Sequence, residues 1–139
     1  MIIESAANDL LSLAFRLRNG NQDRGLKYIE NTDTGSVTYE CLRFSCRFAV
    51  NDNDSDPHRD YLYVTETEKD AAGADGAGRL TDVVPLNTLR VIPGTYRFSV
   101  ELVTYSGTAD SDKADDELVG KQTIAFADEN IIRVHSEVI

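Results

Sequence analysis

The sequence is poor in the residues from which nucleic-acid surfaces and catalytic sites are usually built. Its 139 residues include no tryptophan, two cysteines and two histidines, and 14 basic side chains stand against 24 acidic ones. Binding to phosphate backbones requires lysine and arginine to displace counterions, so a net charge of −10 argues against DNA or RNA as a partner. No nucleic acid is expected on its surface.

Long hydrophobic runs are also missing. No window approaches the roughly 20 apolar residues that a membrane-spanning helix needs. Residues 1–4 lack the basic start and the apolar run of a secretory signal peptide. We expect a protein without a signal peptide that is made and folded in a cytoplasm and has no membrane partner.

The two cysteines predict neither a disulfide nor a redox centre. Cys41 and Cys46 lie in one apolar segment at an odd separation, which on a strand sends their side chains to opposite faces. A disulfide between them would need that strand to break. Because cysteine is among the most buried residue types, we interpret both as buried, reduced thiols.

The histidines do not form a recognisable catalytic motif. His58 lies in an acidic segment and His135 on the polar face of the last expected strand. Neither is near a cysteine, or near a serine flanked by nucleophile-elbow glycines. We therefore do not expect an enzyme. The glycines within residues 73–78 do not match a phosphate-binding spacing, so no cofactor is expected either.

One acidic segment has part of a calcium-binding pattern. Asp52, Asp54 and Asp56 alternate as the first oxygen ligands of a calcium loop do. The sixth position, which glycine normally occupies, is Pro57, and the twelfth, where a bidentate glutamate belongs, is Tyr63. These aspartates are weak candidates for a metal site, and a solvated polar loop is the simpler interpretation.

What the chain does contain is regular alternation of apolar and polar residues. In residues 95–102, every second side chain from Tyr96 to Leu102 is apolar and the intervening ones are polar, which predicts a strand with one buried and one wet face. A Pro-Gly turn at residues 93–94 leads into this strand.

The same pattern predicts further strands. Segments 26–30 and 36–40 flank a turn-rich spacer that ends in glycine, and they predict a hairpin. In the next strand, residues 41–50, the apolar phase changes near Cys41, which indicates a β-bulge or a strand that changes sheet. The remaining expected elements are strands at 61–67, 80–84, 122–126 and 131–137, the last two forming a closing hairpin, and acidic loops at 51–60 and 106–117.

Residues 11–17 are compatible with two structures. Their leucines and Phe15 alternate with smaller or basic residues, as in a strand. They also suit a short helix that Ser5 caps and that Asn19 and Gly20 end. We favour the strand because everything after it is β. The chain then predicts a single all-β domain over residues 1–139, an antiparallel sandwich of about seven to nine strands, with a short N-terminal helix as the alternative.

Tyrosines form a second candidate site. Of the six tyrosines, Tyr61, Tyr63 and Tyr105 fall at strand ends or on less apolar faces, where aromatic rings could stack on a sugar. Ordinary half-buried tyrosines of a β-sandwich are the simpler interpretation, so a small-molecule ligand is not expected.

Three short motifs carry a resemblance to a known family. Pro93-Gly-Thr-Tyr-Arg-Phe98, with Thr34-Gly-Ser-Val37 upstream and Gly120-Lys-Gln-Thr-Ile124 downstream, resembles the small immunoglobulin-like β-sandwich domains of tailed-phage virion proteins. The nearest pattern is that of baseplate and tail-fibre adaptor proteins. The chain departs from it in its two long acidic loops, in its cysteines and in stopping at Ile139.

The resemblance implies a structural virion protein of a tailed bacteriophage. Such a protein would be made in the bacterial host cytoplasm and would assemble in the tail or baseplate through contacts with other virion subunits, as a homo-oligomer or in a symmetric assembly. The acidic loops and chain ends would then make the contacts. Capsid decoration or a head-tail connector role is the first alternative, and a carbohydrate-binding module is the second.

Overall fold

The chain folds mainly into β-strands. The structure, a computed structural model, describes residues 1–49, 61–73 and 78–136. Of these described residues, 61% are in strands and 8% in helices, so the expected all-β class is confirmed. Within the described residues, no helix is both long and apolar enough to cross a membrane. The helical segments are η1 (Lys69–Ala71), α1 (Leu86–Leu89) and η2 (Lys113–Asp115).

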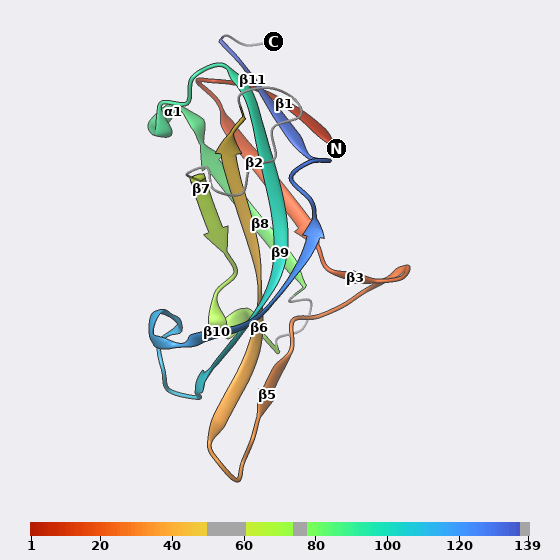
Figure 1. Ribbon diagram of the computed structural model, residues 1–139, viewed down its shortest axis with the longest axis vertical. Coiled ribbons are helices and arrows are strands. Elements are labelled where there is room, and N and C mark those ends of the chain that lie inside the picture. Colours follow the sequence, from red (N-terminus) through yellow and green to blue (C-terminus); the bar gives the residue numbers. More distant parts are fainter. Residues whose placement is uncertain (50–60, 74–77, 137–139) are drawn as a thin grey trace.

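Two long strands form the centre of the molecule. Strand β6 (Ser36–Phe48) pairs antiparallel with β9 (Gly94–Thr108). Their register is unbroken from Ser36 opposite Thr108 to Phe48 opposite Tyr96. In Figure 1 the two strands run along the long axis of the molecule. We call this pair the central ribbon.

Each strand of the ribbon has two shorter partners along its outer edge. β5 (Tyr28–Glu30) and β7 (Tyr61–Glu66) pair antiparallel with β6, and β10 (Glu117–Ala125) and β11 (Ile131–His135) pair antiparallel with β9. β1 (Ile2–Ala6) joins β11 in parallel. This seven-stranded sheet is therefore mixed rather than purely antiparallel.

The predicted closing hairpin is wrong. The fully described strands β10 and β11 follow one another along β9, with Ala125 opposite Val100 and Ile131 opposite Arg97. The loop of residues 126–130 between them interrupts one antiparallel path without reversing it. A turn signal in the sequence marks a break in a strand, but it does not say whether the chain turns back there.

A second layer of two strands packs on the ribbon. β2 (Leu10–Arg16) pairs antiparallel with β8 (Arg79–Pro85). The ring of Phe15 lies 5.8 Å from that of Phe44 and 5.9 Å from that of Phe98, measured between centroids. The strand interpretation of residues 11–17 is confirmed and the N-terminal helix is wrong, because β8 supplies the backbone partners. A small hairpin of β3 (Arg18–Asn19) and β4 (Gln22–Asp23) projects sideways from β2 (Figure 1).

The two ends of the ribbon bury apolar side chains on opposite faces. Toward β2 and β8, Leu42 and Phe44 on the even-numbered face of β6 are 1% and 0% exposed. At the other end, Val37, Tyr39 and Cys41 on the odd-numbered face are 1%, 0% and 0% exposed. The predicted bulge or change of sheet near Cys41 is wrong, since β6 stays in one sheet and in register with β9 across this position. The apolar phase changes because the covering elements change side.

Both cysteines are buried and free, as predicted. Cys41 and Cys46 occupy opposite faces of the same strand and are 0% and 4% exposed. Burial raises the pKa of Cys41 to about 11 and that of Cys46 to about 12. Thiols with such pKa values stay protonated at neutral pH, so they act as small core residues.

The second acidic loop is shorter than predicted. β9 continues to Thr108 and β10 begins at Glu117, so that only residues 109–116 lie between them. The pairing of Glu117 with Ser106 extends the sheet into the polar segment. Polar composition therefore did not mark the strand ends here, because backbone hydrogen bonds to a neighbouring strand do not depend on side-chain polarity.

Truncating the centre of the core provides a test of this packing. Phe44 is 0% exposed and contacts two other phenylalanine rings, so Phe44→Ala should lower the free energy of unfolding by about 3–5 kcal/mol. Urea denaturation measures the change. The matched variant Phe126→Ala, at a ring that is 54% exposed, should shift it by less than about 0.5 kcal/mol. Equal effects of the two variants would contradict the assignment of the core.

Candidate functional site

Polar residues gather on the odd-numbered face of the ribbon, at the end where the even-numbered face is apolar. Directly opposite residues in antiparallel strands point to the same face of the sheet. The register therefore forms one continuous polar row from three cross-strand pairs: Arg43 with Glu101, Ser45 with Ser99, and Arg47 with Arg97.

The first pair of this row has its charges matched by neighbours. Arg43 Nε donates a hydrogen bond to Glu66 Oε2 at 2.9 Å, and Arg43 Nη2 donates one to the Tyr105 hydroxyl at 3.1 Å. Burial alone would raise the pKa of Glu66, but the hydrogen bonds from Arg43 and Tyr105 and the charge of Lys113 outweigh it and lower that pKa. Glu101 lies 3.5 Å from the ammonium group of Lys121.

The last pair of the row lies in a pocket. Arg47 and Arg97 are 3% and 2% exposed, and the pocket beside them has a volume of about 300 Å³. The Arg97 guanidinium donates a hydrogen bond from Nη1 to the carbonyl oxygen of Ala127 at 2.8 Å. Among the described residues, the rest of the lining consists of Ser45, Ser99, Thr123, Tyr61, Phe126, Ala127 and Asp128. We call this the arginine pocket.

The loop between β10 and β11 forms one wall of the arginine pocket. Asn130 holds the loop closed, because its side-chain amide donates a hydrogen bond to the carbonyl oxygen of Phe126 at 2.6 Å. The Asn130 carbonyl accepts a hydrogen bond from the Phe98 backbone at 3.2 Å. The interruption that separates β10 from β11 thus creates the space in which the pocket opens.

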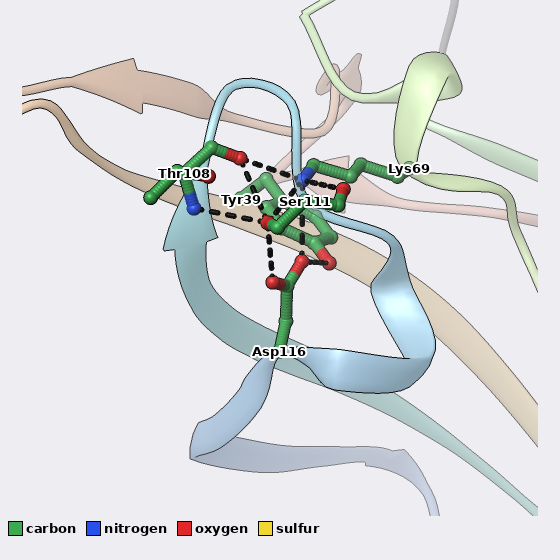
Figure 2. A network of polar contacts seen from close by, with 5 residues as sticks. All are labelled: Tyr39, Lys69, Thr108, Ser111 and Asp116. Carbon is green, nitrogen blue, oxygen red and sulfur yellow. Dashed lines mark hydrogen bonds and ion pairs between the residues drawn. The ribbon is translucent and has the colours of Figure 1, made fainter.

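A buried polar cluster lies at the other end of the same face (Figure 2). The Tyr39 hydroxyl donates a hydrogen bond to Asp116 Oδ2, and Ser111 Oγ donates one to Asp116 Oδ1 at 2.5 Å. Lys69 Nζ lies 3.2 Å from Asp116 Oδ2 and donates a hydrogen bond to the Thr108 carbonyl oxygen at 2.9 Å. The Asp116 side chain is 1% exposed. The cluster therefore joins β6, η1 and the segment after β9.

The charges in this cluster stabilise one another. Burial alone would raise the pKa of Asp116, but hydrogen bonds from Ser111, Tyr39 and Lys69 outweigh it and hold that pKa below its ordinary value. Burial and the hydrogen bond to the Asp116 carboxylate raise the pKa of Tyr39. Asp116 stays ionised and Tyr39 stays protonated at neutral pH, so the cluster holds these segments together. We call the group of Tyr39, Lys69, Ser111 and Asp116 the fastener.

The three tyrosines of the sequence-based sugar site do not share a surface. β7 has a register shift, so that Tyr61 lies opposite Arg47 whereas Tyr63 lies opposite Cys46, on the other face. Tyr61 is 52% exposed at the arginine pocket. Tyr105 packs with its ring centroid 5.6 Å from that of Tyr39, in the fastener region.

Tyr63 links the two layers of the fold. Its hydroxyl donates a hydrogen bond to Asp82 Oδ2 of β8 at 2.5 Å. This hydrogen bond lowers the pKa of Asp82, while burial and the same hydrogen bond raise the pKa of Tyr63. Tyr63, which was a predicted ligand-stacking residue, therefore connects the main sheet to the β2–β8 layer.

The remaining sequence-based candidates are not brought together. Asp52, Asp54 and Asp56, together with His58, lie outside the described residues. His135 Nε2 lies 3.4 Å from Glu4 Oε1 across the parallel β1–β11 pair. Within residues 1–49, 61–73 and 78–136, no group of three or more histidine, cysteine or acidic side chains is arranged to hold a metal ion.

The arginine pocket was not foreseen from the sequence. Alternation placed Arg97 on the wet face of its strand, and the structure buries it. Its position opposite Arg47 depends on the register between strands that are far apart in the chain. An arginine on the polar face of each long strand was the only signal in the sequence, and it carries no information on register.

Comparisons with protein-family models, with curated proteins and with solved structures find no match to this chain.

Removing the charge at the centre of the fastener provides a test of its role. Asp116→Asn should lower the free energy of unfolding by about 1–3 kcal/mol at pH 7, because buried donors lose a charged acceptor. A depressed native pKa stabilises the fold above the unfolded-state value of about 3.9, and this stabilisation is lost as the pH falls through the native pKa. The difference between variant and wild type should shrink below about pH 4.

Urea denaturation at several pH values measures both effects. Asp115→Asn is the matched control, since Asp115 is exposed and adjacent in sequence. It should change stability by less than about 0.5 kcal/mol at every pH. A variant at Asp116 that behaves like this control would show that the cluster contributes nothing to stability.

Proposed function

We propose that the chain is a structural virion protein of a tailed bacteriophage that assembles through protein-protein contacts in the tail or baseplate. The observation that carries this proposal is an apolar surface along an edge strand. Leu118, Val119 and Ile124 of β10 and Phe126 after it are 43%, 52%, 41% and 54% exposed. Apolar side chains gathered on one edge are typical of protein contacts.

Strand β10 has room for a neighbour. Among the strands that the structure describes, it pairs only with β9, so its other edge is open. Its register against β9 shifts between Leu118 and Gly120 and again between Thr123 and Ala125. Such irregularities, together with Lys121, disfavour the addition of a continuous further strand. We infer a contact made by side-chain packing around Val119 and Ile124.

The occupant that we propose for this edge is a second copy of the chain. Homo-oligomers are the commonest soluble assemblies, and tail structures repeat their subunits around an axis. A net charge of −10 makes the copies repel one another, and salt screens that repulsion while leaving apolar contacts intact. Association should therefore strengthen as the salt concentration rises.

The architecture is compatible with the finer part of the proposal, an immunoglobulin-like sandwich. The β2–β8 layer faces the main sheet across a phenylalanine core, as the two layers of a sandwich do. We propose that this small second layer is the reduced half of such a sandwich. The parallel β1–β11 pair is a departure from the purely antiparallel arrangement.

The edge contact can be tested by sedimentation equilibrium. The wild-type chain should associate, and more strongly at 500 mM than at 50 mM salt. The double variant Val119→Glu, Ile124→Glu should stay monomeric at both concentrations, because it places charges in the apolar contact. The control Val83→Glu adds a charge at a residue of β8 that is 44% exposed, and it should still associate. A monomeric wild type at all salt concentrations would contradict the contact.

The virion assignment has its own test. An antiserum against the chain should label purified phage particles at the tail or baseplate, and genes for portal, tube or tape-measure proteins should flank its gene. Label on the capsid or at the neck would favour the decoration or connector role instead. Neighbouring genes for sugar-degrading enzymes, with glycan binding that is lost in Tyr61→Ala, would overturn the assignment in favour of a carbohydrate-binding module.

A further inference from the structure

We infer that the arginine pocket binds a small oxyanion, a carboxylate or a phosphate. Arg47 and Arg97 lie directly opposite one another in the ribbon, and both guanidinium groups are buried on the same face. A guanidinium group buried in a region of low dielectric raises the free energy of the fold unless negative charge lies beside it.

Arg97 carries the argument because its contacts are neutral. It forms no ion pair with any residue in the described parts of the chain. Its Nη1 donates a hydrogen bond to the carbonyl oxygen of Ala127, and its Nε has no hydrogen-bond partner among the described residues. A carbonyl oxygen satisfies one donor but does not neutralise a charge. An anion in the pocket would do so.

The acidic residues closest in the row are already engaged. Glu101 pairs with Lys121, and Glu66 pairs with Arg43 and Lys113. Asp128 is the one carboxylate among the described lining residues, and it is exposed. Among the described residues, therefore, no buried carboxylate lines the arginine pocket, and a bound anion would supply the negative charge that Arg97 lacks there.

The rest of the lining suits an oxyanion. Ser45, Ser99, Thr123 and Tyr61 line the pocket, and each has a hydroxyl group that can donate a hydrogen bond to a ligand oxygen. Arginine binds carboxylate and phosphate through a planar fork of donors. A volume of about 300 Å³ is at the lower end of ligand pockets, which indicates a small ligand.

Isothermal titration calorimetry on the full chain tests the inference. Phosphate and acetate are titrated separately at constant ionic strength, with chloride as the reference salt. We expect saturable binding of at least one of the two oxyanions, and the stronger of them identifies the ligand class. No saturable binding of either would overturn the inference.

Three variants locate the binding. Arg97→Gln keeps a side-chain donor for Ala127 but removes the charge, and it should weaken binding about tenfold or more. Arg79→Gln removes the same charge from a side chain that is 53% exposed outside the pocket, and its affinity should stay within about twofold of wild type. Equal losses in both would show that only overall charge matters, and would overturn the site.

A third variant keeps the site testable if Arg97→Gln does not fold. Ser99→Ala leaves both arginines and their contacts in place, and it should weaken binding about threefold to tenfold through the loss of one donor. If Arg97→Gln does not fold, this variant decides the outcome. Unchanged affinity in folded Ser99→Ala would overturn the pocket as the site. The association experiment on β10 uses different residues, so failure of the edge contact and failure of anion binding are distinguishable.

Discussion

The unbroken pairing of β6 with β9 is the constraint on which the rest of the structure depends. It determines which residues stand opposite one another over the whole length of both strands, and each outer edge then accepts two shorter strands in succession. Since no shorter strand spans the full edge, the sheet has interruptions on both sides. The arginine pocket opens at one of these interruptions, where the loop between β10 and β11 leaves the sheet.

Because the ribbon is longer than the layer that covers it, it cannot bury the same face throughout. β2 and β8 cover the even-numbered face around Phe44, and the tyrosine stack with the Asp116 fastener covers the odd-numbered face around Tyr39. At each end of the ribbon one face is apolar and the other is polar. The apolar face is the even-numbered one around Phe44 and the odd-numbered one around Tyr39. This arrangement explains why a polar row can run beside a fully packed core, and why charged groups such as Arg97 become buried without lying in the apolar layer.

The surface and the interior use charge in different ways. The exterior carries the excess of negative charge that keeps copies apart, and the apolar residues of β10 offer a contact that can act against this repulsion. The interior of the odd-numbered face contains matched pairs at Glu66 and Asp116. Arg97 differs from them, because its side-chain hydrogen bond within the described residues goes to a neutral carbonyl oxygen. Assembly and anion binding are thus proposed for neighbouring regions of one sheet, which share Phe126.

The sequence by itself determined the all-β class, the hairpin at Asn31–Gly35 and the burial of both cysteines, because a period of two and turn-forming residues are local properties. It favoured a strand at residues 11–17 but left a helix open, and the pairing with β8 decided between them. Only the tertiary structure decided that β11 continues β10 along β9, that Tyr61 and Tyr63 point to opposite faces, and that Arg97 is buried opposite Arg47. Alternation states which side chains share a face. It does not state which strand lies alongside, in which register, or which face another layer will cover, because those depend on contacts between residues far apart in the chain.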